Sequence, residues 1–334
     1  NNFRIHYNKS GSDAPEQTDN NKNGIPDFVD SVNYYFEYAL DKLTNTLKYE
    51  GLLPDNNNGG GNEFDIYIKD LSSGNYGYTT FEDMVSGVEA IPRYTTFITI
   101  DNDFRDLYTS GMNGLKITAA HELFHAIQIG RYGAWMDDIY YYEIFSTWIE
   151  TYLFPGIKDY YQYLNTFFTS TNRPLWNHSG YDLTIWGIFI AKKYSPAALK
   201  TILEGFKKYS PIKATDEALK YYGASLVTEY ADFANWIYFT SYRAKNDAYF
   251  PEASNYPLIS GSSLKIVNFI SPSCTIGTYL NSLASQFYSL KYGNDSVGII
   301  SIRANLNEAI EKNENYGQSV LKLSESGYDS RNIT

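Results

Sequence analysis

The residues best suited to chemistry lie in the segment HELFH (121–125), which has the pattern HExxH. Residues four apart stack on one face of an α-helix, so His121 and His125 can direct two imidazoles at one metal ion. Glu122 flanks that face and can accept a proton from a water that the metal activates for attack on a carbonyl. The chain has 4 histidines, so this spacing is improbable by chance. The pattern predicts a zinc site with Glu122 as general base. The alternative is a surface helix on which these residues merely share a face.

A catalytic zinc needs a third protein ligand and an open position for water. The sequence YYYEIFSTWIE (140–150) predicts a second helix that presents Glu143. Turn residues in the linker 130–138 allow this helix to run back antiparallel to the first. We therefore expect Glu143 to be the third ligand. The alternatives for this position are Glu150, Asp137 and Asp138.

These motifs resemble those of the gluzincin metallopeptidases, whose thermolysin-type members carry HExxH followed by N-E-x-x-S-D. In the second helix, Glu143 matches the zinc-binding glutamate of that family and Ser146 matches its serine. Tyr142 replaces the asparagine, and Thr147 replaces the aspartate that supports a zinc-ligating histidine. Glu150, one turn further along, could take that supporting role.

The chain is also similar, over about 1–250, to a little-characterised group of secreted bacterial proteins regarded as metalloproteases. The ordered motifs of that group occur here as FRIHY, DNNKNGIPD, DIYIKD, HELFHAIQ and EIFSTWIE. The resemblance implies a zincin-like fold, a secreted zinc peptidase and an accessory β domain. We accordingly expect a peptide or protein substrate and a secreted or cell-surface location, with the signal peptide outside this sequence. We also expect a monomer.

A second metal site is predicted in TDNNKNGIPDFVD (18–30). Oxygen ligands at alternate positions of such a loop converge on Ca²⁺, as they do in the EF-hand loop, and Gly24 would allow the sharp bend. We expect a structural calcium ion here. The alternative is an Asn-rich turn before a helix that begins at Pro26. The predicted ligands are Asp19, Asn21, Asn23, Ile25 through its carbonyl, Asp27 and Asp30.

Peptide hydrolysis also needs a donor that stabilises the oxyanion. In gluzincin-like enzymes a Tyr or His from a later helical region does this, so the resemblance favours Tyr181 first and His178 second. The chain has 33 tyrosines, so packing is the alternative role for Tyr181. Zincins also pair an extended substrate with an edge strand that precedes the zinc helix. We expect this role for the strand at 95–101, and the alternative is an ordinary core strand.

The apolar pattern predicts an α+β protein. Strands are expected at 3–7, 63–70 and 95–101. Helices are expected at 26–49, 115–130 (with Gly130 as C-cap), 138–154, 157–168, 181–194, 197–208, 214–222 and 225–245. The strand-like stretches LKIVNFI, SQFYSLKY, VGIISIRA and SVLKLS follow a boundary near 255.

From this order we expect a zincin-like catalytic domain over 1–255, with a mixed sheet in about 1–110 and a helical part in about 111–250. A small β-sandwich-like domain is expected over 256–334.

Composition excludes several classes of function. The chain has 27 Lys+Arg and 38 Asp+Glu, a formal charge of −11, which disfavours nucleic acid as a partner. No apolar run is long enough for membrane insertion. The single cysteine, Cys274, excludes a CxxC zinc site. The competing function is an adhesin-type binding protein with a structural or vestigial zinc site. Glu122 favours the enzyme, because a structural zinc has four closed ligands and no use for a base.

Overall fold

The computed structural model describes residues 2–54, 56–71, 74–85, 91–268, 276–277, 279–291, 318–324 and 327–333. The chain divides into two compact units. The first comprises Asn1–Tyr163 and Ser179–Ala218, and the second comprises Leu164–His178 and Leu219–Thr334. This division falls inside the region that the sequence assigns to one catalytic domain, and the domain boundary near 255 stays a prediction.

A four-stranded mixed sheet begins the first unit. Its strands are β1 (Phe3–His6), β2 (Phe64–Lys69), β3 (Gly77–Met84) and β4 (Tyr94–Asp101), in the order β1-β2-β4-β3. The first, second and fourth strands are parallel, and β3 runs antiparallel to β4. The sequence predicted all of these strands except β3, which shows no clear alternation of buried and exposed residues.

The strand order corrects one prediction. The strand at 95–101 was expected at an edge, but it is β4 and lies between β2 and β3. Its backbone groups pair with both neighbours, so it is a core strand and has no free edge for a substrate. Within the described sheet the edge strand on this side is β3. The error follows directly from the missed strand, because the neighbours of β4 are set by the fold rather than by its own sequence.

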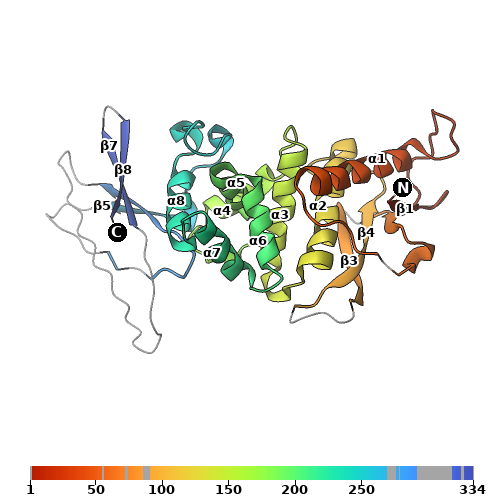
Figure 1. The fold of residues 1–334 in the computed structure, drawn as a ribbon. Coiled ribbons are helices and arrows are strands. Elements are labelled where there is room, and N and C mark those ends of the chain that lie inside the picture. Colours follow the sequence, from red (N-terminus) through yellow and green to blue (C-terminus); the bar gives the residue numbers. More distant parts are fainter. Residues whose placement is uncertain are drawn as a thin grey trace. The chain divides into compact units, whose positions relative to one another are not determined.

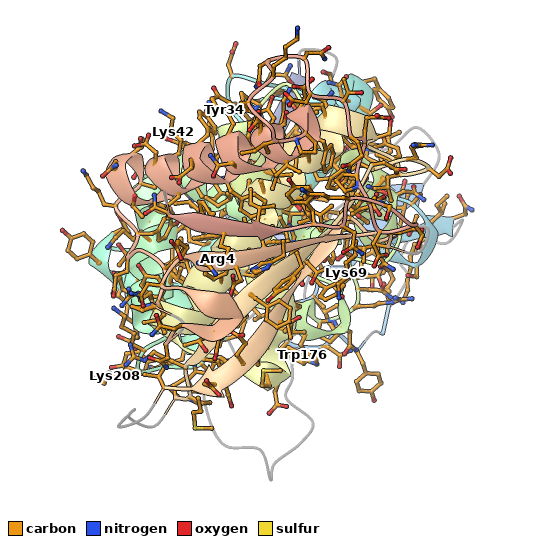
Figure 2. The ribbon with its side chains drawn as sticks, turned by 90° about the vertical axis from the view of Figure 1, so that its right-hand side faces the viewer. Arg4, Tyr34, Lys42, Lys69, Trp176 and Lys208 are labelled. Atoms are coloured by element: carbon orange, nitrogen blue, oxygen red, sulfur yellow. The ribbon has the colours of Figure 1, made fainter. Side chains whose placement is uncertain are left out.

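Two helices cover the sheet. α1 (Asp27–Asp41) contacts β1, α2 (Gly111–Ile127) contacts β3 and β4, and the two helices pack against each other (Figure 1). Tyr34 and Lys42 lie on the outer side of this helical layer (Figure 2). The apolar stripe of α1 is buried, as its helical spacing predicted. None of the helices in the described part of the chain is both long and apolar enough to cross a membrane.

Further helices complete the first unit. α3 (Ile139–Leu153) packs against α2 and against α5 (Thr184–Tyr194), which in turn packs against α6 (Pro196–Gly205). Most side chains of α3 are buried, because it lies between other helices. α4 (Tyr161–Phe168) and α7 (Pro211–Tyr221) each contribute residues to both units.

In the described part of the second unit, a further α-helix is followed by two pairs of short strands. α8 (Leu226–Tyr238) begins with a capping box at Ser225 and ends earlier than the predicted helix at 225–245. β5 (Leu264–Asn268) and β6 (Phe287–Lys291) form a parallel pair. β7 (Gln318–Ser324) and β8 (Gly327–Ile333) form an antiparallel pair. The α+β class is therefore confirmed. The strand predicted at 297–304 lies outside the described residues, and the sandwich-like arrangement stays a prediction.

The end of the helix that carries HExxH differs from its prediction. Gly130 does not cap it, because a π-helical turn over Gln128–Tyr132 continues α2 and ends at Gly133. Gly133 has φ 104°, a conformation that L-residues rarely adopt. A Cβ atom at this position would also lie 2.5 Å from Cγ2 of Ile91. Two independent constraints therefore require glycine here.

Replacing Gly133 by alanine tests this end of the helix. Gly133→Ala should lower the free energy of unfolding by about 2–4 kcal/mol, because left-handed strain of about 1 kcal/mol adds to overpacking of about 1–3 kcal/mol. Gly11 is the matched control, since it has φ 91° but nothing within 4 Å of its added Cβ. Gly11→Ala should cost only the strain. Equal losses in urea unfolding would show that the contact with Ile91 does not matter.

Candidate metal centre

The antiparallel packing of α2 and α3 brings the predicted residues together. Ser146 Oγ lies 3.1 Å from His125 Nδ1, and Glu150 Oε1 lies 2.6 Å from His121 Nδ1. As residue numbers fall along α2 they rise along α3, so the two helices run in opposite directions, as the turn residues between them predicted.

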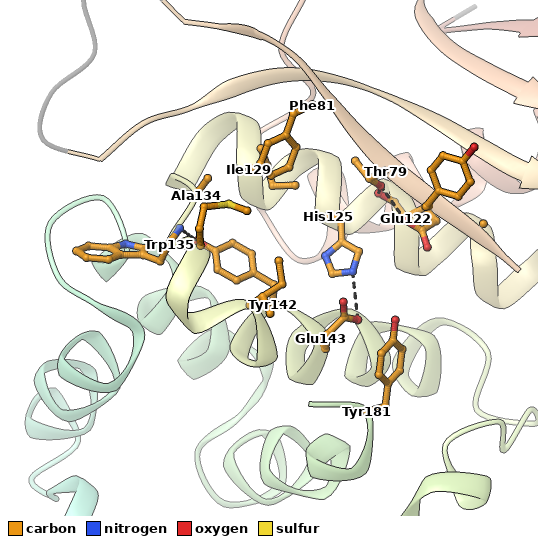
Figure 3. A pocket seen from close by; sticks show the side chains of 14 residues that line it. Thr79, Phe81, Glu122, His125, Ile129, Ala134, Trp135, Tyr142, Glu143 and Tyr181 are labelled. Atoms are coloured by element: carbon orange, nitrogen blue, oxygen red, sulfur yellow. Dashed lines mark hydrogen bonds and ion pairs between the residues drawn. The ribbon is translucent and has the colours of Figure 1, made fainter. Parts of the chain in front are cut away.

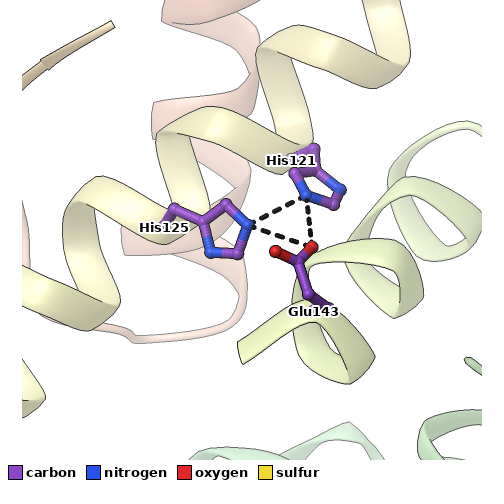
Figure 4. Close-up of side chains that lie close together, drawn as sticks. All are labelled: His121, His125 and Glu143. Atoms are coloured by element: carbon purple, nitrogen blue, oxygen red, sulfur yellow. Dashed lines mark hydrogen bonds and ion pairs between the residues drawn. The ribbon is translucent and has the colours of Figure 1, made fainter. Parts of the chain in front are cut away.

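Three potential ligand atoms converge between these helices (Figure 4). Nε2 of His121 lies 2.9 Å from Nε2 of His125 and 3.0 Å from Oε2 of Glu143, and His125 Nε2 lies 3.3 Å from the same oxygen. Tetrahedral coordination at 2.0–2.1 Å separates ligand atoms by about 3.3 Å. Among the described residues, this is the one group of three or more His, Cys, Asp or Glu whose ligand atoms lie within 4.8 Å of one another. The donor set therefore fits a zinc-sized ion.

The other ring nitrogen of each histidine has an acceptor. A carboxylate only accepts, so His121 Nδ1–H donates to Glu150, which makes the contact that the sequence suggested for it. His125 Nδ1 lies 2.9 Å from Oε1 of Gln128, whose own Nε2 donates to the carbonyl of Tyr142 and so fixes the orientation of the amide. Both tautomers therefore leave Nε2 free to bind a metal.

Gln128 is a further residue of the site that the motifs in the sequence do not indicate. It lies three residues after His125 and its side chain is fully buried. The available signal was a polar residue three positions after the second histidine, because i and i+3 share a helix face.

The electrostatics of the group favour a cation. Burial by itself lowers the pKa of His121, but the carboxylates of Glu143 and Glu150 outweigh burial and hold that pKa well above its ordinary value. Burial by itself raises the pKa of Glu143, yet the two imidazoles hold it well below its ordinary value. Burial raises the pKa of Glu150 to about 7, against the lowering effect of His121. The site thus stabilises positive charge between the carboxyl groups of Glu143 and Glu150.

Glu122 lies beside the edge strand. The hydroxyl of Thr79 on β3 is 2.8 Å from Glu122 Oε2 and 3.0 Å from the Glu122 carbonyl oxygen (Figure 3). This hydrogen bond holds the carboxylate in the pocket next to His125. The sequence could not indicate Thr79, because the strand that carries it was not predicted.

Tyr181 also lies at the site. Its ring stacks parallel to that of His121, with centroids 5.6 Å apart, and it lines the pocket near Glu143 (Figure 3). Burial, followed by the charges of Glu143 and Glu122, raises the pKa of Tyr181. The hydroxyl therefore stays protonated near neutral pH and can act as a donor.

Gly180 permits this position of the tyrosine. It has φ 97°, and a Cβ on it would lie 2.3 Å from the carbonyl oxygen of Tyr140 and 2.5 Å from Cβ of Glu143. The turn that carries Tyr181 therefore packs directly on the backbone of α3 beside the third ligand.

The remaining candidates are not part of the triad. Asp137 and Asp138 lie in the short 3₁₀ turn Met136–Asp138 before α3. His178 belongs to the second unit, where its ring packs against Phe167 at 5.3 Å, and it is not among the described residues that line the pocket. Its predicted role in oxyanion stabilisation stays a prediction.

The predicted calcium loop is held by its own side chains. Asp19 Oδ2 accepts a hydrogen bond from the backbone of Gly24 at 2.9 Å. Asp30 Oδ2 accepts from the side-chain amides of Asn21 and Asn23, at 2.8 and 2.9 Å. Four of the predicted ligands are thus joined through one hydrogen-bonded loop around the bend at Gly24.

The other two predicted ligands are arranged differently. The carboxylate of Asp27 accepts from the side chain of Asn20 at 2.6 Å. The backbone N–H of Ile25 donates to Asn23 Oδ1 at 2.8 Å. Asp27 is therefore engaged outside the loop centre, at a position where EF-hand loops often bind calcium through a water.

Comparisons with known proteins do not identify the chain: no protein-family model matches it, and no curated protein or solved structure matches it. The resemblance to gluzincin peptidases thus rests on the sequence motifs. The geometry adds a possible metal-binding triad of His121, His125 and Glu143.

The contact between Glu150 and His121 provides a test of metal binding. Glu150→Gln should weaken zinc binding by about 10–100-fold, because the amide no longer supports the imidazole with a negative charge. Competition with a chromophoric chelator measures this. Asp65→Asn is the matched control, since Asp65 is also buried and lies 2.6 Å from His6. If Glu150→Gln bound zinc as tightly as Asp65→Asn, Glu150 would have no such role.

Proposed function

We propose that this chain is a zinc peptidase of the gluzincin type with a zincin-like fold. His121, His125 and Glu143 hold the metal and Glu122 is the general base. The observation that carries the proposal is the convergence of these three ligand atoms beside a pocket that Glu122 also lines. Three protein ligands next to an accessible pocket are the arrangement of a catalytic rather than a structural zinc site.

The chain's own residues provide the remaining functions of a hydrolase. Bound zinc supplies a Lewis acid that polarises a peptide carbonyl and lowers the pKa of water. Glu122 accepts the proton of the attacking water, and Thr79 keeps its carboxylate oriented. Tyr181, protonated and half-buried, donates to the carbonyl oxygen as negative charge develops on it.

The edge strand provides a place for the peptide backbone. Among the described strands, β3 pairs with β4 alone, and it carries Gly77, Tyr78 and Thr79 along the pocket. An extended peptide adds to such an edge through main-chain hydrogen bonds. β3 thus takes the substrate-pairing role that the sequence predicts for the strand at 95–101.

The competing function is an adhesin-type binding protein with a structural zinc. The peptidase is favoured by the position of Glu122 in the pocket, because a structural site has no use for a base there. Secretion belongs to the same proposal and follows from the resemblance to secreted metalloproteases.

Replacing the general base separates the two functions. Glu122→Gln should retain zinc while kcat/KM for peptide cleavage falls by about 10²–10⁴-fold, because only the proton acceptor is lost. Zinc content by mass spectrometry and cleavage of a peptide library measure the two effects. A variant as active as the wild type would exclude this mechanism, and a zinc-loaded wild type that cleaves no peptide would favour the binding protein.

We also propose that the loop 18–30 binds a structural calcium ion. Asp19 and Asp30 place carboxylate oxygens at one bend, and Asp30 lies in the first turn of α1. The amide oxygens of Asn21 and Asn23 lie in the same loop, where they accept from the backbone N–H groups of Asn23 and Ile25. A cation between the carboxylates of Asp19 and Asp30 would join the loop to α1, the helix that contacts β1.

Calcium should therefore stabilise the protein. At a concentration 100 times its Kd, Ca²⁺ should raise the free energy of unfolding by about 2.7 kcal/mol and raise Tm accordingly. Asp30→Asn should abolish the shift in a thermal melt. Asp41→Asn, which changes an aspartate at the other end of α1, should preserve it. Identical calcium responses in the two variants would rule out Asp30 as a ligand.

A further inference from the structure

The ring of Tyr181 contacts two other rings. It is parallel to the imidazole of His121, with an angle of 4° between the planes and centroids 5.6 Å apart. It also lies against Tyr163, with centroids 5.2 Å apart and planes at 40°. Among the described residues these are its two aromatic neighbours, and all three residues belong to the first unit. Of the two neighbours, Tyr163 lies outside the metal-binding triad.

The backbone at Tyr181 is fixed, but the backbone does not fix the side chain. Gly180 packs on α3, and the hydroxyl of Thr184 donates to the Tyr181 carbonyl oxygen at 2.7 Å. A tyrosine side chain still has two rotatable bonds, so contacts of its ring must select one orientation. A donor that stabilises an oxyanion has to be in place before the reaction, because a misplacement of about 1 Å is costly. The contacts of this ring therefore matter for the proposed role of Tyr181.

Tyr163 is itself held in place at the start of α4. Asp159 lies four residues earlier and is 5% exposed. Its carboxylate accepts hydrogen bonds from the hydroxyl of Tyr76 and from the side-chain amide of Gln162, both at 2.9 Å. The Tyr76 hydroxyl in turn accepts from the backbone N–H of Thr109 at 2.8 Å. Because Tyr76 directly precedes β3 and Thr109 lies two residues before α2, the start of α4 is tied to both elements.

Tyr163 does not belong to the described lining of the pocket, whereas Tyr181 does. Burial, followed by the charges of Asp159 and Glu150, raises the pKa of Tyr163, so its side chain stays uncharged near neutral pH. The ring is therefore a neutral packing surface for its aromatic neighbour. A role of Tyr163 in the reaction would be exerted through the ring that it contacts.

We infer that Tyr163 is a positioning residue: its ring holds the ring of Tyr181 parallel to the imidazole of His121 and so keeps the hydroxyl of Tyr181 where a substrate carbonyl can reach it. Functional groups are held in their productive geometry by neighbours that lock their rotamers through packing. The inference rests on the proposed function, because it takes Tyr181 to be the oxyanion donor of a zinc peptidase.

The position of the Tyr181 ring can be measured without any reaction. An aromatic ring stacked on His121 shifts the NMR signals of the imidazole protons, so Tyr181→Leu should change these signals. Tyr163→Leu keeps apolar volume for folding but cannot stack, and it should reproduce most of that change. Tyr163→Phe keeps the ring and should leave the signals as in the wild type. The spectra are recorded with and without zinc.

The kinetic prediction concerns turnover more than substrate binding. Tyr163→Leu should lower kcat for peptide cleavage by about 3–10-fold and change KM by less than about twofold, because the loss falls on charge that develops in the transition state. In a Tyr181→Phe background, which lacks the donor, the same substitution should change kcat by less than about twofold. Tyr161→Leu is the matched control, since Tyr161 is also half-buried on α4 but its ring packs on Tyr160 at 4.9 Å. It should leave kcat and the His121 signals unchanged.

These results separate the positioning role from the proposed function. His121 signals that do not respond to Tyr163→Leu overturn the positioning role, as do equal losses of kcat in both backgrounds. A response of the His121 signals to Tyr163→Leu, in a protein that binds zinc but cleaves no peptide, supports the placement of the Tyr181 ring and rejects the peptidase.

Discussion

The packing of α2 against α3 in one antiparallel register is the constraint on which the rest of the site depends. It is fixed by contacts one helical turn apart, His125 with Ser146 and His121 with Glu150. A shift of either helix by one residue would rotate its side chains by about 100°, and Glu143 would leave the two imidazoles. The sheet, the linker and α5 all serve to hold this pair of helices.

This register places ionisable groups inside an apolar layer. The α2 segment around the motif and most of α3 are buried, and burying a charge is costly unless it is paired. His121 lies between Glu143 and Glu150, while His125 faces Glu143 and the neutral amide of Gln128. The Nδ1 atoms of the two imidazoles thus contact different groups, the carboxyl group of Glu150 at His121 and the neutral amide of Gln128 at His125.

The features that sequence predicted are local ones. His121 and His125 share a face because they are four residues apart, and this holds for any straight helix. The convergence of Glu143 required only that the second helix turn back, which the linker indicated. β1, β2 and β4 were predicted within a few residues, and so was the start of α1, but α1 ends at Asp41 whereas the predicted helix runs to 49.

The features that sequence could not predict depend on distant parts of the chain. β3 lacks a regular burial pattern, so both the strand and the contact of Thr79 with Glu122 were missed. A glycine at position 130 is a typical residue to end a helix. The glycine with a positive φ is, however, Gly133. Which of two nearby glycines ends a helix depends on neighbours such as Ile91, which lies far away in sequence.

Gly180 limits which substitutions the site tolerates. Its missing methyl group is what lets the turn with Tyr181 lie against the backbone of α3 at Glu143. Any side chain at 180 must push the turn and the helix apart, so it displaces the tyrosine and the third ligand together. Tyr181 and Glu143 come from separate segments of the chain, yet a substitution at position 180 changes the positions of both side chains and cannot change only one.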